Sequence, residues 1–268
     1  MSESVLIEEE RGVLRITVDR QARMNAIDLA TMDELGELIT AAHTRPDTRV
    51  IVLTGAGKAF CTGADLAAAA AAGGNEAAPE RVMDSANAVI RAIVASPLPV
   101  IARVNGPAAG VGTSIALAAD LIYAAETAYL LLPFTSIGLM PDGGATAMVA
   151  AAMGRVRAAE LALLGARLPA PEAAAAGLIT RSLPADQLDA EVDAVAAKLA
   201  AGPRRSLELT KAAINAATLT ELDAALDREK TGQSELLVSP DFLEGMTAVL
   251  TRRPPRFAGA PAPITDPA

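Results

Sequence analysis

Large rings and reactive side chains are scarce in this sequence. Its 268 residues include no Trp, two Tyr and four Phe, although 51% of them are apolar. Most of the apolar residues are Ala and Val, so the core must bring backbones close together instead of packing large rings. The chain is long enough to bury a sizeable core as one large domain, or as a core with an appendage.

The chain has one Cys and one His, which limits its chemistry. Cys61 has no partner for an internal disulfide, and this suits a reducing cytoplasm. His43 would have to serve any Ser-His or Cys-His site, but it lies where a helix is expected to end before Pro46, a position typical of a helix-dipole partner. No spacing of His, Cys and Asp resembles a metal site, so we expect no metal.

Long apolar runs and basic clusters are missing as well. No uncharged apolar run reaches the ~18 residues of a membrane span, and the acidic N-terminus lacks the apolar segment of a signal peptide. The net charge is −9, and no cluster of Lys and Arg exceeds a few residues. These features predict a cytoplasmic protein without a nucleic-acid or membrane partner.

Alternating apolar strands and helices indicate an α/β core. Residues 5–20 predict a hairpin with Arg11-Gly12 in the turn, and Asp28 can cap the helix that follows. The segment "RVIVLTG" is typical of a parallel strand that is buried on both faces. The low-complexity residues 67–78 predict a mobile loop or a frayed helix. The further expected elements are a helix at 79–96, a strand in "PLPVIARV", a helix from near Thr113, strands in "LIYAA" and "AYLLL", helices in "ATAMVAAAM", "RAAELALL" and "APEAAAA", and a strand in "LIT" at 178–180.

Helical patterns dominate the C-terminal part. They occur at 187–201, 203–217, 220–238 and from 240 onward. We divide the chain into an α/β core, residues 1–190, and a C-terminal helical part with an exposed Pro- and Gly-rich tail, residues 191–268. Apolar stripes on these helices predict contacts between subunits: Val192, Val195, Ala196, Leu199, Leu222, Ala225 and Leu226.

Two strands end in Gly-rich turns that lead into helices, "TGAGKAFCTGADL" and "NGPAAGVGTSIAL". Such turns present free backbone N–H groups to a negative oxygen. Neither is a phosphate loop, because the Gly-x-Gly-x-x-Gly spacing fails at Phe60 and at Ile115. Each turn could serve only close packing of strand against helix. Alternatively, the two could converge on one oxygen and form an oxyanion hole.

These two turns, in this order and spacing, resemble the enoyl-CoA hydratase/isomerase (crotonase) family. Further matching motifs are "NAI" at 25–27, "IGLMPDGG" at 137–144, "A…AAGLI" at 173–179 and "SPDFLEGMTAVLTRRPPRF" at 239–257. The resemblance implies repeated ββα units in a β/β/α superhelix, with C-terminal helices used for trimerisation. It also implies a coenzyme A thioester as substrate, with no cofactor bound permanently, and a homotrimer or a dimer of trimers.

The resemblance further implies that the thioester carbonyl oxygen lies between the N–H groups of Ala64 and Val111. The family usually has Gly at the latter position, and the Val111 side chain narrows the acyl pocket. The carbonyl oxygen gains charge when a proton is removed α or γ to the thioester. Two preorganised donors then lower the barrier by several kcal/mol.

The family pattern breaks at the two glutamates of its hydratases. Counting along the motifs places Ser114 and Phe134 at these positions, so the carboxylates that activate water and protonate the α-carbon are missing. A carboxylate appears instead at Asp142, where some isomerases of the family carry their base. A single base suffices for a 1,3-proton shift, and apolar neighbours such as Leu139 and Met140 would raise its pKa. In the alternative interpretation Asp142 is only the Asp of a Pro-Asp-Gly turn.

The remaining expectations concern the ligand. Arg23 and Lys58 could meet CoA phosphates, while Phe242 and Lys230 could contact the adenine. Asp65 can cap the helix of "GADL" or fix the turn. Glu80 and Asp84 lie on the helix after the mobile loop, where a solvated helix face is favoured over a face toward the acyl pocket. The expected CoA-binding set is Arg23, Ala26, Lys58, Ala64, Asp65, Leu66 and Phe242, and the expected acyl pocket is Val82, Ser114, Phe134, Leu139 and Met140.

Three functions remain open at this point. The first is an enoyl-CoA isomerase that uses Asp142 as its base. The second is another enzyme on the same scaffold, such as a hydratase with different acids or a thioester hydrolase. The third is a CoA-thioester-binding protein with little activity, since both usual acids are gone.

Overall fold

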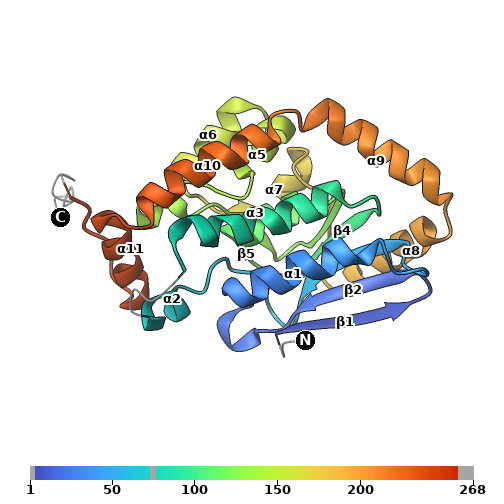
Figure 1. Ribbon diagram of the computed structural model, residues 1–268, viewed down its shortest axis with the longest axis horizontal. Helices are drawn as coiled ribbons and strands as arrows, with labels where there is room; N and C mark the ends of the chain where they lie inside the picture. Colours follow the sequence, from blue (N-terminus) through green and yellow to red (C-terminus); the bar gives the residue numbers. More distant parts are fainter. Residues whose placement is uncertain (1–3, 73–76, 259–268) are drawn as a thin grey trace.

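The fold is an α/β core with helices around it (Figure 1). The computed structural model describes residues 4–72 and 77–258. The strands are β1 (Val5–Glu10), β2 (Val13–Val18), β3 (Val50–Gly55), β4 (Val100–Val104), β5 (Ala108–Ala109), β6 (Leu121–Ala125), β7 (Tyr129–Leu131), β8 (Leu168–Pro169) and β9 (Arg181–Leu183). The helices are η1 (Gln21–Arg23), α1 (Leu29–Ala42), α2 (Leu66–Ala72), α3 (Pro79–Ala95), α4 (Val111–Leu117), η2 (Phe134–Ile137), α5 (Ala145–Met153), α6 (Arg155–Leu164), α7 (Ala170–Ala175), α8 (Leu188–Ala200), α9 (Arg204–Thr218), α10 (Leu222–Leu236) and α11 (Pro240–Leu250).

The main sheet has six strands in the order β1-β2-β3-β4-β6-β9. Its first pair is the expected antiparallel hairpin, with Arg11 and Gly12 at positive φ in the turn. From β2 to β9 all pairings are parallel. Every residue of β3 is buried, which confirms the prediction from its continuous apolar sequence. A smaller sheet, β5-β7-β8, lies beside the second Gly-rich turn.

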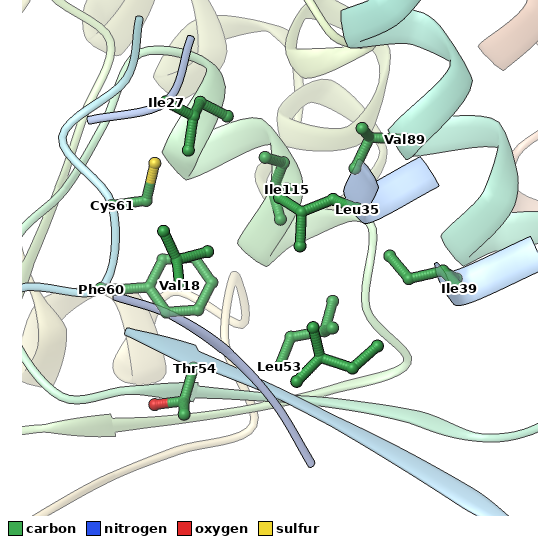
Figure 2. Close-up of a pocket in the computed structure, with 11 residues that line it drawn as sticks. Val18, Ile27, Leu35, Ile39, Leu53, Thr54, Phe60, Cys61, Val89 and Ile115 are labelled. Atoms are coloured by element: carbon green, nitrogen blue, oxygen red, sulfur yellow. The ribbon is translucent and has the colours of Figure 1, made fainter. Parts of the chain in front are cut away.

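Helices bury both faces of the main sheet. α1 and α3 pack side by side, α8 contacts β2, β3, β4 and β6, and Asp28 caps α1 through the Thr31 N–H as expected. Figure 2 shows a void where Val18 and Leu53 of the sheet face Leu35, Val89 and Ile115 of the helices. It holds about 20 Å³ and is almost wholly apolar. We assign it to the packing of the core and not to a ligand.

Gly36 offers a test of the α1–α3 packing. It lies inside α1, and a Cβ added there would be 3.7 Å from the Val89 backbone N, an ordinary van der Waals contact. Gly36→Ala therefore adds helix propensity without a clash, and we expect the free energy of unfolding to rise by about 0.5–1 kcal/mol. Urea denaturation would measure this. A lower midpoint would show that the two helices cannot accept the methyl group.

The structure corrects two boundaries in the core. The strand expected at 178–180 is β9, three residues later, where Arg181–Leu183 pair with β6. The helix expected near Thr113 begins at Val111, because Gly110 takes positive φ and ends the preceding strand there. Of the low-complexity stretch 67–78, residues 67–72 form the greater part of α2, while 73–76 lie outside the described residues. Residues 259–268 of the expected tail also lie outside them.

The C-terminal helices occur where the sequence predicts them, but their apolar stripes have a different role. Val192, Ala196, Leu222, Ala225 and Leu226 are buried within this chain, so they cover its own core and not a neighbouring subunit. The boundary drawn at residue 190 falls inside α8, which lies on the main sheet. α11 lies beside α2, at the end of the molecule away from α9 (Figure 1). None of the helices in the described ranges is long and apolar enough to cross a membrane.

Candidate active site

The first Gly-rich turn follows β3 and presents Ala64. The Asn25 side chain organises it, since Nδ2 donates to the carbonyls of Ala56 and Ala59 and Oδ1 accepts from the Arg20 N–H. Ile27 pairs with Ala64 in an isolated parallel bridge, in which Ile27 N–H donates to Gly63 and Asp65 N–H donates to Ile27. This explains the "NAI" motif, which fixes the backbone on both sides of Ala64.

The second turn leads from β5 into α4 and presents Val111. Cys61 and Ala108 form a bridge between the turns, and the Ala109 N–H donates to the Cys61 carbonyl at 2.9 Å. A Cβ on Gly63 would lie 3.0 Å from the Ala109 oxygen and 3.6 Å from Gly110 Cα. The residues that directly precede the two donors are therefore in contact.

Both donors are free for a ligand. Within residues 4–72 and 77–258, neither the Ala64 N–H nor the Val111 N–H donates to a protein acceptor. Val111 begins α4, so its N–H is one of the groups that a helix leaves unsatisfied at its first turn. Two free N–H groups on touching turns fit the oxyanion hole that the resemblance implies.

Asp142 lies in the loop between η2 and α5, next to this second turn. Asp142 is 8% exposed, and the Ser114 hydroxyl donates to the backbone carbonyl oxygen of Asp142 at 2.7 Å. Gln233 on α10 donates from Nε2 to Asp142 Oδ2 at 2.8 Å. Asp142 Oδ1 is buried and has no partner among the described residues. A buried carboxylate oxygen without a partner is unusual in a turn residue, and it is suited to take a proton from a bound ligand.

The environment of Asp142 raises its pKa to about 7, chiefly because burial disfavours the charged form. The negative charge of Glu229 acts in the same direction, while the hydrogen bond from Gln233 opposes it. A carboxyl group with this pKa is divided between its two protonation states near neutral pH. It can therefore accept a proton from one carbon and return it to another.

The two positions of the missing glutamates are both buried. Ser114 lies on α4 and binds the Asp142 backbone, and Phe134 lies at the start of η2. A Cβ on Gly110 would be 3.8 Å from Phe134 Cζ, so the ring packs against the second turn. Leu139 joins this group through its N–H bond to the Phe134 carbonyl. The structure thus brings Val111, Ser114, Phe134, Leu139 and Asp142 together.

The other expected ligand residues differ in exposure. Arg23, Lys58 and Ala64 are exposed, Ala26 is buried, and Leu66 opens α2 half-buried. Val82 on α3, Met140 before the Pro-Asp-Gly turn and Phe242 on α11 are half-buried. Contacts of these residues with a ligand remain predictions.

Several acids have structural partners. Asp65 accepts from the Ala68 N–H as a helix cap and pairs with Arg20 at 3.1 Å, so its side chain stabilises the first turn. Lys230, considered for the adenine, pairs with Asp84 at 2.5 Å. Asp120 accepts from the Val100 N–H and pairs with Lys211.

Sequence reasoning missed Gln233 and Glu229. Both are 1% exposed and lie four residues apart on α10, where they hold the loop around Asp142. Their segment "LDREKTGQSEL" looks like an ordinary solvated helix, and no local signal separates these two residues from their charged neighbours.

Comparison with known proteins decides the family. Residues 8–260 match the enoyl-CoA hydratase/isomerase family. The chain belongs to this family. This match confirms the resemblance and the crotonase-like fold inferred from the motifs. Members of the family act on acyl-CoA thioesters.

Relatives within the family are named either hydratase or isomerase. A probable enoyl-CoA hydratase of Rhodobacter capsulatus is 41% identical over 96% of this chain and 98% of its own. The 1,2-epoxyphenylacetyl-CoA isomerase of Escherichia coli is 36% identical over 97% of this chain and 100% of its own. The crystal structure of an enoyl-CoA hydratase from Mycobacterium avium subsp. paratuberculosis superposes with a TM-score of 0.88 at 48% identity, covering 95% of this chain and 98% of that one. Family membership therefore leaves the reaction to be argued from the site.

Proposed function

We propose that this member of the enoyl-CoA hydratase/isomerase family moves the double bond of an enoyl-CoA. In a 3-enoyl-CoA, Asp142 Oδ1 takes a proton from the α-carbon, and the bonding electrons flow toward the thioester oxygen. The N–H groups of Ala64 and Val111 bind that oxygen as it becomes negative. The same carboxyl returns the proton to the γ-carbon, which leaves the double bond between the α- and β-carbons.

The observation that carries this proposal is the buried Oδ1 of Asp142, which has no partner within residues 4–72 and 77–258 and belongs to a residue whose backbone oxygen contacts Ser114 on α4. The residues at the two hydratase positions, Ser114 and Phe134, support the same proposal by exclusion. Neither has a carboxylate that could activate water, so a base that only moves protons is the chemistry this site supports. The rise of the Asp142 pKa to about 7 suits the return of the proton.

Two alternatives are kept as outcomes of the test. The first is another enzyme on this scaffold: relatives named hydratase favour water addition by different acids, and hydrolysis of the thioester is the other reaction to be tested. The second is a CoA-thioester-binding protein of low activity, which the loss of both glutamates favours. The relative named 1,2-epoxyphenylacetyl-CoA isomerase adds a ring-derived thioester to the substrates worth testing.

A panel of CoA esters in heavy water, followed by mass spectrometry, tests the proposal. An isomerase converts a 3-enoyl-CoA to its 2-enoyl isomer, which chromatography separates before the mass measurement, without gain of water. Deuterium enters the product only to the extent that the Asp142 carboxyl exchanges with solvent before it returns the proton. Products heavier by one water would establish hydration, and free CoA would establish hydrolysis. Binding without turnover of any ester would support the third alternative.

We also propose a homotrimer or a dimer of trimers. Large apolar side chains that are exposed in one chain support this: Val156, Leu163 and Leu164 on α6, and Leu209 and Ile214 on α9. Light scattering at micromolar concentration is expected to give three or six times the 27.3 kDa of one chain. The mass of a single chain would contradict this proposal.

A further inference from the structure

The loop that carries Asp142 is held by one helix that lies far away in the sequence. From α10, Glu229 Oε2 accepts from the Gly144 N–H at 2.6 Å, and Oε1 accepts from the Thr146 N–H at 3.0 Å and the Thr146 hydroxyl at 2.5 Å. One turn later, Gln233 Oε1 accepts from the Met140 N–H at 3.1 Å. The backbone is thus fixed on both sides of the aspartate.

The Met140 contact also decides how the Gln233 amide is oriented. A backbone N–H requires an acceptor, so the carbonyl end of the amide faces Met140 and the NH₂ end faces Asp142. Oδ2 is therefore occupied by a donor, and Oδ1 is left without a partner in the described part of the chain. α10 consequently selects which oxygen of the base is free to meet the substrate.

Glu229 adds a charge to the same place. Burial raises the pKa of Glu229, while the hydrogen bonds that its two oxygens accept from Thr146 and Gly144 oppose this rise and favour the ionised carboxylate. The charge of Glu229 raises the pKa of Asp142, whereas the hydrogen bond from Gln233 lowers it.

The other charged groups on the elements around Asp142 lie at the surface. α4, α5 and η2 contain no ionisable residue. The charged residues of α3, including Glu80 in its first turn, are exposed. Most of them form ion pairs at the surface: Arg81–Asp33, Asp84–Lys230, Arg91–Asp223 and Arg91–Asp227. On α10, Arg228 is exposed and pairs with Glu221.

We propose that Gln233 and Glu229 are the positioning residues of the Asp142 base. Gln233 holds Oδ2 and directs Oδ1 to the substrate, and Glu229 fixes the loop and places a negative charge beside the carboxyl. The two residues therefore act on the base in opposite directions. This inference rests on the proposed function only for its role in turnover, since the effect on Asp142 itself does not depend on the reaction.

The test is a ¹³C NMR titration of the Asp142 carboxyl carbon, assigned by its absence from Asp142→Asn. Gln233→Met keeps the size of the side chain and removes the donor, so the Asp142 pKa should rise by about one unit. Glu229→Gln removes the charge, so the pKa should fall. Loosening of the loop would admit water and lower the pKa in both variants, so a rise in Gln233→Met separates positioning from mere disruption.

Two further variants serve as controls. Glu229→Asp keeps the negative charge, so its Asp142 should titrate closer to the parent value than that of Glu229→Gln. Glu235→Gln removes an exposed charge from the same helix and should leave the titration unchanged. The proposal is overturned if Gln233→Met leaves the pKa unchanged or lowers it, or if Glu229→Gln and Glu229→Asp shift it equally.

Turnover on a 3-enoyl-CoA separates this inference from the proposed function. Because the carboxylate is the active form, the acid limb of the kcat/KM profile should move to higher pH in Gln233→Met and to lower pH in Glu229→Gln. If Asp142→Asn is inactive while both profiles stay at the parent position, the inference is wrong and the function stands. If Asp142→Asn stays fully active, the function is wrong, and the NMR titrations still decide whether α10 controls the carboxyl.

Discussion

Asp142→Asn is expected to lower kcat/KM on a 3-enoyl-CoA by at least ~10²-fold, the usual contribution of a positioned general base. Asn keeps the size of the side chain, can accept from Gln233 and serves similar turns, but it cannot take a proton from the α-carbon. Steady-state kinetics with purified protein would measure the loss. An Asn variant with parental activity would mean that Asp142 is only a turn residue.

The same variant should be more stable than the parent at alkaline pH, because ionising the buried Asp142 is costly. Its pKa is about 7 in the folded protein against an ordinary value of 3.8, so the folded state binds more protons between these pH values. The parent therefore loses stability as pH rises from about 4 to 7, and Asn has no such loss. We expect the stability difference between Asn and parent, on the order of 1 kcal/mol or more at pH 8, to shrink toward pH 4.

Denaturant titrations of both proteins at pH 4.5, 6 and 8 would measure this difference. A constant difference would contradict the raised pKa, whatever the kinetic result. Combined with the activity loss, a gain at pH 8 would separate a residue kept for chemistry from one kept for folding.

Gly112→Ala is expected to cost both stability and activity. Gly112 is the second residue of α4, and a Cβ there would lie 2.2 Å from the Cys61 carbonyl oxygen and 2.8 Å from Cys61 Sγ. The obstacle is backbone, so the two turns must separate. We expect a destabilisation of about 3 kcal/mol, the upper range for overpacking.

Separation of the turns also moves the Val111 N–H away from the Ala64 N–H. A misplacement of about 1 Å at such a site can cost ~10²-fold in rate, so kcat/KM should fall by at least ~10-fold even at temperatures where the variant is folded. Thermal melts and kinetics at 15 °C would measure the two effects separately.

Gly36→Ala is the matched control, since it makes the same change inside a helix with only ordinary contacts. Ala favours a helix over Gly by about 1 kcal/mol, so any loss in Gly112→Ala must come from the contact with Cys61. Parental activity and stability in Gly112→Ala would show that the two donors do not depend on this contact.

The sequence by itself determined the order of the elements and singled out Asp142 as the proposed base. Continuous apolar strands such as β3 can be read locally, because burial on both faces leaves no polar position in the run. The positions of Ala64, Val111, Ser114, Phe134 and Asp142 followed from counting along motifs, and the structure brings the last four of them together. The absence of both hydratase carboxylates needed no coordinates.

Only the tertiary structure decided what each apolar stripe and each carboxylate oxygen does. The stripe of Val192 and Ala196 has the same pattern whether it covers its own sheet or a second subunit, and only the packing of α8 on that sheet settles this. Gln233 reaches Asp142 from 91 positions away, and Glu229 holds the same loop from a similar distance. Hydrogen bonds over such separations depend on how α10 crosses the core, which no local spacing of residues records.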